Sequence, residues 1–521
     1  MAFLALLLLK PLVISPLLAF TFLVLRTVYR ISPLHPLSHI PGPYLPRMSS
    51  LWLVYHAWIG DECTVVHKLH QQYGPIVRTG PFSVDIADGE ALNDIYVAKG
   101  GFRKAAFYGN FDIDGHKSIF SEVIPENRAP RAKAVLPLFA TAHLRAGKDV
   151  LDSIVQGFVA KCARQAEVSR RTNRPVNLLD LTRGLAVDAV TGYLFGRAYG
   201  GLEHERREEG ERKADAKAKD EERGEMSANG MVDLFVGVGR FWYLPAWSFQ
   251  WVDWLDAKFG VGSSKDVDNS LGLVDDFVAG VVENARLALE AAKPDDGGVD
   301  GVTRASYPGR LLSAGLSISE TQAQCKDLIF AGTDSTGMNL ATIVFYLAKH
   351  PDIMERLKAE LQEKKDVIDL MEIQSFPLLR GVVKEGLRLS MANPSRLPRV
   401  VPASGWAFKG IQFPANTEVS CTPFELHLNP EVFEDPCVFD PTRWIDDGAK
   451  SKEMERDAIP FGLGPRQCIA RNLATAELFL AVKGLVESGV LRGAQPVKDK
   501  IEILEWFNSH VIEGKIDMRW V

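Results

Sequence analysis

The segment "PFGLGPRQCIAR", residues 460–471, contains two glycines, two prolines, two arginines and a single cysteine. Gly462 and Gly464 permit tight backbone turns, so several N–H groups can point at one sulfur. Cys468 directly precedes an amphipathic pattern, and the dipole and free amides at the start of a helix favour an anion. Arg466 adds positive charge. The segment therefore predicts a thiolate that is presented to a partner.

The residues around this cysteine favour a flat partner. Phe461 supplies an apolar surface, and Ile469 and Ala470 keep the start of the helix small. The six cysteines of the chain are scattered and form no C-x-x-C pair, so neither a zinc ribbon nor a disulfide scaffold is indicated. A thiolate with one open side suits a single metal bond, and it fits a haem iron better than a zinc site.

A long helix is predicted over residues 319–350. Ser319 and Gln322 form a capping-box start, and Pro351 marks the end. The centre of this helix reads "AGTDST", residues 331–336, where Gly332 is a poor helix former by about 1 kcal/mol. A local rule broken at the centre of a buried element indicates function. A solvated kink is the alternative.

Two further motifs lie between this helix and the cysteine segment. In "EGLR", Glu385 and Arg388 are three residues apart on a predicted helix and share a face. Short strands are predicted over residues 399–424, and the segment "FDPTRW" ends at Trp444, directly after Arg443. Another hairpin is predicted at residues 76–87, where two β-rich runs are broken by a Gly-Pro pair.

The cysteine segment resembles the haem-binding signature F-x-x-G-x-R-x-C-x-[AG] of the cytochrome P450 family. Its positions are filled by Phe461, Gly464, Arg466, Cys468 and Ala470, where many members have glycine at the last position. "AGTDST", "EGLR" and "FDPTRW" are similar to the family's oxygen-activation, E-x-x-R and P-x-R motifs, in the same order. The resemblance implies a mainly α, α+β fold: a prism-like helical domain, a smaller β-rich lobe, and haem between the long central helix and the cysteine-loop helix.

The resemblance also implies roles for single residues. Cys468 is the expected axial ligand of the haem iron, and Ala331 is expected beside the haem. Asp334 and an adjacent hydroxyl are expected to relay protons. Ser335 occupies the usual threonine position; because successive helix residues point about 100° apart, only one of Ser335 and Thr336 is expected to face the haem. We favour Ser335 and keep Thr336 as the alternative.

Glu385, Arg388 and Arg443 resemble the family's buried Glu–Arg–Arg cluster, a structural lock without direct chemistry. The haem propionates need cations, for which the candidates are Arg466, Arg399, Arg128 and Lys133. A solvated basic face is the alternative for residues 128–133. The pocket walls are expected from residues 102–124, 231–254, 325–333 and 393–396, with aromatic side chains that suit a bulky apolar ligand.

The implied function is a haem–thiolate monooxygenase that inserts one oxygen atom from O2 into an apolar small molecule by hydroxylation, epoxidation or successive oxidation. The general character of the sequence resembles that of fungal members of the family. The expected substrate is therefore a secondary metabolite, such as a terpenoid or polyketide. The cofactor is haem b (iron protoporphyrin IX). Electrons are expected from NADPH through NADPH-cytochrome P450 reductase, with cytochrome b5 as a further candidate donor.

Three other functions remain as alternatives. A haem–thiolate isomerase or dehydratase needs no external electrons, but it is expected to lack the acid–alcohol pair present at residues 334–335. A non-catalytic haem protein that binds a ligand would not need that pair either. A cysteine-nucleophile hydrolase needs a histidine partner, and none lies near Cys468 in the sequence. The net charge of −6 argues against a nucleic-acid partner.

The N-terminus is apolar from residue 2 to residue 25 except for Lys10, and Arg26 and Arg30 follow. This length and charge order predict a transmembrane anchor over residues 1–30 with the following domain in the cytoplasm, on the endoplasmic reticulum membrane. A cleaved signal peptide is the alternative. Residues 31–46, rich in proline, are expected to form a stiff, extended hinge, and residues 47–521 a single catalytic domain.

Overall fold

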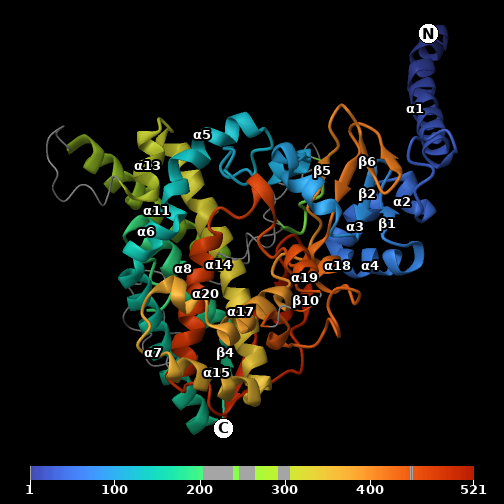
Figure 1. Ribbon diagram of the computed structural model, residues 1–521. Coiled ribbons are helices and arrows are strands. Elements are labelled where there is room, and N and C mark those ends of the chain that lie inside the picture. The colour runs from blue at the N-terminus through green and yellow to red at the C-terminus, as the bar shows by residue number, and fades with distance from the viewer. Residues whose placement is uncertain are drawn as a thin grey trace.

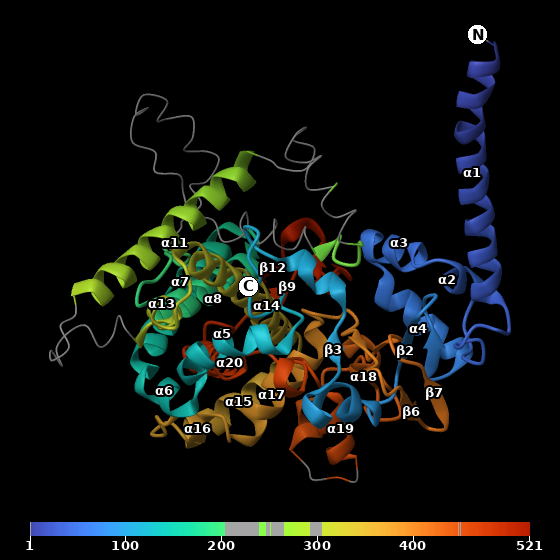
Figure 2. The ribbon, with the colours of Figure 1, turned by 90° about the horizontal axis from the view of Figure 1, so that it is seen from above.

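The computed structural model describes residues 2–203, 239–245, 251, 265–291, 305–445, 448 and 450–521. The chain is mostly helical with several small sheets, as the sequence predicts (Figure 1). A helical lobe surrounds one central helix, and a smaller lobe carries the largest sheet. The N-terminal helix projects away from both lobes (Figure 2).

The described helices of four or more residues labelled α have the following bounds: α1 (Ala2–Ile31), α2 (Tyr44–Met48), α3 (Leu51–Ile59), α4 (Glu62–Tyr73), α5 (Pro125–Val135), α6 (Thr141–Ala146), α7 (Lys148–Thr172), α8 (Leu178–Phe195), α11 (Lys265–Ala291), α13 (Tyr307–Ser313), α14 (Ile318–Lys349), α15 (Pro351–Glu363), α16 (Leu370–Ile373), α17 (Pro377–Ser390), α18 (Pro423–His427), α19 (Ser451–Asp457) and α20 (Arg471–Glu487). Shorter helical turns include η1 (Asn93–Val97), η3 (Ala106–Phe111), η6 (Pro441–Trp444) and η7 (Gly464–Arg466).

The central helix is α14, which packs against α8, α17 and α20. Its start differs from the prediction: Ser317, not Ser319, is the N-cap, and it forms a capping box with Glu320. The sequence offers two serines two residues apart, and only the one followed by a carboxylate at the third helical position closes the box.

The helix α14 runs without interruption through residues 331–336, so the solvated kink is not formed. A Cβ atom on Gly332 would lie 2.8 Å from Cγ2 of Val190 on α8, and one on Gly337 would lie 2.7 Å from Cγ of Arg183. The two glycines therefore let α8 approach α14 closely. The close packing of α8 against α14 explains why glycine, a poor helix former, occupies position 332.

The largest sheet has five strands in the order β1-β2-β8-β5-β3. The predicted hairpin is confirmed: Ile76 of β1 pairs with Ile86 of β2 in antiparallel register. The strand β2 runs parallel to β8, and β3 pairs antiparallel with β5 so that Lys104 lies opposite Arg399. Two cations are thus brought side by side by the register, an arrangement that is destabilising unless an anion joins them.

The strands of the five-stranded sheet are β1 (Ile76–Arg78), β2 (Ser83–Ile86), β3 (Arg103–Lys104), β5 (Arg399–Val400) and β8 (Glu418–Ser420). The other sheets are formed by β4 (Val176–Asn177), β12 (Asp517–Trp520) and β9 (Ala494–Pro496), by β6 (Trp406–Phe408) and β7 (Ile411–Phe413), and by β10 (Ile503–Leu504) and β11 (His510–Val511).

The proline-rich segment 31–46 is not the extended hinge that the sequence predicts. It folds into successive turns, and its Leu37 and Ile40 are completely buried in the core of the β-rich lobe. The guanidinium of Arg78 donates to the backbone carbonyls of Arg30 at 3.1 Å and Pro81 at 2.8 Å. Apolar residues between the prolines therefore turn a predicted spacer into part of the domain.

The N-terminal residues form the single helix α1, whose side chains are exposed along residues 17–25. None of the helices in the part of the chain that the structure describes combines the length and the apolar character that crossing a membrane requires.

Candidate functional site

The cysteine loop lies between α19 and α20 and is held by its own backbone. The N–H of Cys468 donates to the carbonyl of Phe461 at 2.9 Å, and the N–H of Gln467 donates to Gly464 at 3.1 Å. Gly462 and Gly464 have φ values of +65° and +67°, which favour glycine. A Cβ atom on Gly464 would lie 1.9 Å from the carbonyl oxygen of Tyr96 in η1, so the loop is pressed against that turn.

Cys468 is free and accessible, three residues before α20 begins at Arg471. Although Cys468 is accessible, many protein atoms surround its sulfur, and this desolvation raises the pKa of the thiol to about 11. The N–H of Ala470 and the charge of Arg471 act in the opposite direction. The expectation that Arg466 stabilises the thiolate is wrong, because its guanidinium is turned away to the carbonyls of residues 122 and 123.

The loop offers one metal ligand, the sulfur of Cys468, so it fits a metal ion whose other ligands belong to a cofactor. Within the described ranges, no three His, Cys, Asp or Glu side chains gather where they could hold a metal ion. Phe461, Ile469 and Ala470 are half-buried beside the accessible sulfur. A thiol with a raised pKa is deprotonated when a metal binds it. The site thus suits one metal–thiolate bond against a flat apolar group.

The central helix α14 carries an accessible face at the middle of its length. Ala331 is exposed, and Ser335, one turn later, is half-buried and donates its hydroxyl to the Ala331 carbonyl at 2.8 Å. Thr333 and Thr336 are buried. Of the two candidate hydroxyls, the structure therefore places Ser335, and not Thr336, on the same face as Ala331.

Asp334 lies away from that face and is almost completely buried. Its Oδ1 accepts a hydrogen bond from Nη2 of Arg183 on α8 at 2.7 Å, and both side chains are at most 3% exposed. Sequence reasoning missed Arg183. The feature of the sequence that could have indicated it is the position of an arginine within the apolar run of residues 178–195, because a buried charge needs a partner.

The structure brings together three of the four predicted propionate cations. Burial, and then the charges of Arg128 and Arg399, lower the pKa of Arg466 to about 10. The guanidinium groups are held by backbone carbonyls: Arg128 donates to Ile119 at 3.1 Å and Arg399 to Pro398 at 3.0 Å. The fourth candidate, Lys133, is exposed on α5.

Lys104 is a fourth cation of this cluster that the sequence did not reveal. It is 4% exposed, its Nζ donates to the Phe120 carbonyl at 2.7 Å, and it lies 4.1 Å and 4.0 Å from the ring centroids of Tyr108 and Phe120. Burial and the charges of Arg399, Arg466 and Arg128 lower its pKa well below the usual value. Nothing in "GFRKAAFYG" distinguishes it from a surface lysine.

We call Lys104, Arg128, Arg399 and Arg466 the cation cluster. In the ranges that the structure describes, no member forms an ion pair with a carboxylate within 4.0 Å. Like charges gathered out of water are unfavourable unless an anion joins them. The cluster therefore fits a ligand with carboxylate groups, such as the propionates of haem.

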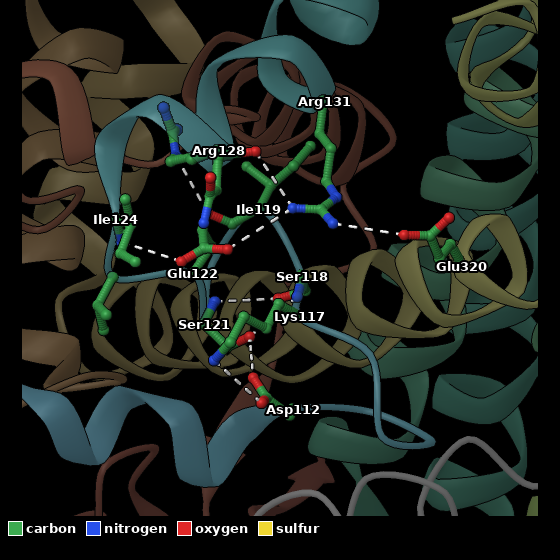
Figure 3. A network of polar contacts seen from close by, with 12 residues as sticks. Asp112, Lys117, Ser118, Ile119, Ser121, Glu122, Ile124, Arg128, Arg131 and Glu320 are labelled. Carbon is green, nitrogen blue, oxygen red and sulfur yellow. Dashed lines mark hydrogen bonds and ion pairs between the residues drawn. The ribbon is translucent and has the colours of Figure 1, made fainter. Parts of the chain in front are cut away.

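The segment between η3 and α5 is tied to the start of α14 by a polar network (Figure 3). Arg131 reaches Glu122 at 3.8 Å and Glu320 of α14 at 3.5 Å. The Glu122 carboxylate also accepts from the N–H of Ile124 at 2.9 Å. At the other end of the segment, Ser121 donates to Asp112 at 2.6 Å. Arg131 thus serves the fold here and is not part of the cation cluster.

Glu385, Arg388 and Arg443 are brought into direct contact. Arg388 binds the Glu385 carboxylate through two N–H groups, at 2.7 and 2.9 Å, and Arg443 donates to it at 3.0 Å. The indole of Trp444 donates to the same carboxylate at 2.9 Å. Arg388 also binds the carbonyls of residues 427 and 436. The cluster joins α17 to η6 and the segment that leads to the cysteine loop.

Two comparisons with known proteins agree with this site. A family model described as cytochrome P450 matches residues 41–488. The chain is 38% identical over 513 residues to cytochrome P450 monooxygenase mfmF of Annulohypoxylon moriforme, covering 97% of this chain and 99% of that protein. It is 27% identical over 478 residues to conidiogenone synthase PchP450 of Penicillium rubens (90% of each chain), and 27% identical over 463 residues to pisatin demethylase of Fusarium vanettenii (87% and 84%).

The accessible thiol and the cation cluster fit the class of proteins that hold a metal-bearing, anionic cofactor through one cysteine. The chain belongs to the cytochrome P450 family, and its activity is that of a cytochrome P450 monooxygenase. Membership implies a haem bound by a cysteine thiolate, a redox partner and a small-molecule substrate.

Proposed function

We propose that the protein oxidises an apolar secondary metabolite, such as a terpenoid or polyketide, by hydroxylation, epoxidation or successive oxidation. The relatives named above come from fungi, and the printed names of two of them refer to conidiogenone and pisatin. The observation that carries the proposal is the accessible thiol of Cys468 beside the apolar side chains of its loop. When bound, haem supplies the oxygen-activating chemistry, which a thiolate ligand favours.

In this proposal, Cys468 ligates the iron, and Phe461, Gly464 and Ala470 shape the loop beside it. The cation cluster binds the propionates. On α14, the small side chain of Ala331 would leave room for the flat cofactor. The hydroxyl of Ser335 would donate protons at the same face of the helix. Asp334 acts less directly: as long as Arg183 holds its carboxylate, that group orients the helix and supplies no proton itself.

Electrons are proposed to come from NADPH through NADPH-cytochrome P450 reductase, with cytochrome b5 as a further donor. The first measurement is the absorbance of the reduced holoenzyme with carbon monoxide. A strongly red-shifted Soret band is expected for the wild type and is lost in Cys468→Ala. Substrate-dependent NADPH consumption with added reductase then separates a monooxygenase from an isomerase or a ligand-binding protein, both of which would consume none.

We further propose that α1 attaches the catalytic domain to the endoplasmic reticulum membrane, with the domain on the cytoplasmic side. The exposed apolar side chains of α1, among them Leu17, Phe20 and Leu25, support attachment through this helix. Extraction of microsomes tests it. The full chain is expected in the pellet at high salt, and a chain lacking residues 1–31 in the supernatant. Equal distribution of the two forms would contradict the proposal.

A further inference from the structure

The junction where α1 meets the β-rich lobe gathers arginine side chains that have no role in the site described above. Residues 1–60 contain Lys10, Arg26, Arg30 and Arg47 but neither aspartate nor glutamate. Arg26 and Arg30 lie near the end of α1, and Arg47 lies on α2, which packs against α1 (Figure 2). We call Arg26, Arg30 and Arg47 the arginine patch.

Backbone carbonyls hold two members of the arginine patch in place. Nη1 of Arg30 donates to the carbonyl of Met48 at 2.6 Å, and Nη2 of Arg47 donates to that of Ile40 at 2.9 Å. The buried Arg78 of β1 donates in turn to the carbonyl of Arg30 at 3.1 Å. The end of α1 is therefore fixed to α2 and β1, and the fold sets the spacing of these arginines.

No carboxylate offsets this positive charge in the part of the chain that the structure describes: neither the arginine patch nor Arg78 forms an ion pair there within 4.0 Å. Burial, and then the charges of Arg47 and Arg30, lower the pKa of Arg78 to about 10. Burial, and then the charges of Arg78 and Arg30, lower the pKa of the neighbouring His35 to about 4, so this imidazole is neutral. Like charges brought together in this way favour an anion among them.

Exposed apolar side chains lie in the same segments as the arginine patch. Leu34 is 83% exposed, Tyr44 71% and Leu45 66%. The ring centroid of Tyr44 is 5.8 Å from Cζ of Arg47. Along α1 itself, the apolar side chains of residues 17–25 are exposed. An amphiphile with an anionic head group would cover both the cations and this apolar surface, whereas a soluble anion would leave the apolar surface in water.

We propose that the arginine patch binds the phosphate of an anionic phospholipid at a membrane surface. A guanidinium group offers several N–H donors in one plane, which suits phosphate oxygens. A zwitterionic phospholipid fits less well, because its ammonium group would be brought near cations that already repel one another.

The inference deepens the attachment proposed for α1 and rests on it. The apolar residues of α1 would hold the protein at any bilayer, whereas the arginine patch would select a bilayer with negative charge. Because the arginine patch is fixed to α2 and β1, a bound head group would also set how the β-rich lobe faces the membrane.

The test measures, by flotation, how the full-length holoenzyme binds to vesicles of two compositions. One set is dioleoylphosphatidylcholine alone. In the other set, one-fifth is replaced by dioleoylphosphatidylglycerol, which has the same acyl chains and a net negative charge. The wild type is expected to bind the second set at least about tenfold more tightly. High salt is expected to remove this preference and to leave the binding to phosphatidylcholine unchanged.

Two double variants separate the charge of the arginine patch from its structural role. Arg30→Gln with Arg47→Gln is expected to bring the ratio of the two binding constants close to one, and Arg30→Lys with Arg47→Lys, which keeps both charges, to retain most of the preference. The matched control is Arg164→Gln with Arg171→Gln, which removes two exposed arginines from α7, away from α1 (Figures 1 and 2). This control is expected to bind as the wild type does.

Equal binding of the wild type to both sets of vesicles overturns the inference and leaves the attachment through α1 standing. An equal loss of preference in the glutamine variant and in the α7 control also overturns it. So does a loss of preference when inorganic phosphate replaces chloride at constant ionic strength, because a soluble anion would then occupy the site. Weak binding to phosphatidylcholine with a preserved preference for phosphatidylglycerol would contradict attachment through apolar side chains and support the phosphate site.

Discussion

Two adjacent residues of α14, Asp334 and Ser335, differ in what they are able to do. The sequence places them together as an acid–alcohol pair. The structure separates them: Asp334 is bound by Arg183 on the side of α8, whereas Ser335 shares the accessible face with Ala331. A rotation of about 100° per residue makes this separation unavoidable for neighbours in a helix. The hydroxyl is the group that can reach a ligand.

Ser335→Ala is expected to divert several-fold more NADPH into hydrogen peroxide, because it removes the hydroxyl on the accessible face. Ser335→Thr keeps the hydroxyl and adds a β-branch that restricts the rotamer, so coupling should be kept or improved. The measurement is peroxide formed per NADPH consumed with added reductase. Thr336→Val is the control, since that hydroxyl is buried. Equal peroxide yields from Ser335→Ala and the wild type would refute the assignment of Ser335.

Glu477 of α20 is a buried acid without a visible role. It is 1% exposed, and neither carboxyl oxygen has a hydrogen-bond partner among the described residues. Desolvation raises its pKa well above the usual value. Its pKa is then higher in the folded than in the unfolded protein, so this group lowers the stability as the pH rises above about 4.5, the usual pKa of glutamic acid.

Glu477→Gln removes this dependence, because the amide does not titrate. The variant is expected to gain thermal stability relative to the wild type at pH 8, and to gain less at pH 5. Thermal unfolding of both holoproteins at the two pH values checks this. An identical difference in melting temperature at pH 5 and pH 8 would show that Glu477 keeps an ordinary pKa in the folded state.

At the scale of elements, the two glycines of the cysteine loop form a matched pair. Both have positive φ, but a Cβ atom on Gly464 would lie 1.9 Å from the Tyr96 carbonyl oxygen, whereas one on Gly462 would meet nothing closer than 3.9 Å. Gly462→Ala is expected to cost about 1 kcal/mol of stability from backbone strain alone. Gly464→Ala must also displace η1 or the loop, so it should lose most of the bound haem.

The ratio of haem absorbance to protein absorbance measures this difference after purification. If Gly464→Ala and Gly462→Ala have the same ratio of haem to protein absorbance, the contact between Gly464 and η1 does not position the cysteine.

The Glu385 cluster joins α17 to the segment before the cysteine loop. Glu385→Gln leaves two arginines without their carboxylate in a buried place, and the expected loss of stability is about 3–5 kcal/mol. The neighbouring Lys384→Ala removes an ion pair with the largely exposed Glu455 and a cation–π contact with the Trp444 ring, 5.0 Å from its centroid, and should cost no more than about 2 kcal/mol. Thermal unfolding and haem content of the two variants test the contrast, and similar losses in both would contradict a buried lock.

Helix boundaries show what local sequence could and could not predict. The extent of α14 was predicted to within two residues, because proline and a capping box leave local signals. The identity of its N-cap was wrong, since two serines compete. The close approach of α8 that explains Gly332 was out of reach, because the facing residue Val190 is more than a hundred positions away in the sequence.

For the molecule as a whole, four short motifs in a fixed order were enough to predict the family and the mainly helical fold. Both are confirmed. The cysteine and the Glu–Arg–Arg residues stand in recognisable local patterns. Lys104 and Arg183 do not, since their importance comes from strand register and helix contacts that bring distant segments together. The region predicted as a pocket wall at residues 231–254 lies outside the described residues except for 239–245 and 251.

The turns of residues 32–46 decide where the chain can be cut for work in solution. A shortened protein that begins at residue 32 keeps Leu37 and Ile40 in their buried places, and it removes only the Arg30 carbonyl from the acceptors of Arg78. One that begins at residue 47 strips both apolar side chains from the β-rich lobe. We expect the first form to melt within a few degrees of the full chain and the second to be recovered mostly as aggregate, which gel filtration distinguishes. The segment that the sequence predicts to be an extended hinge is thus needed for the domain to fold.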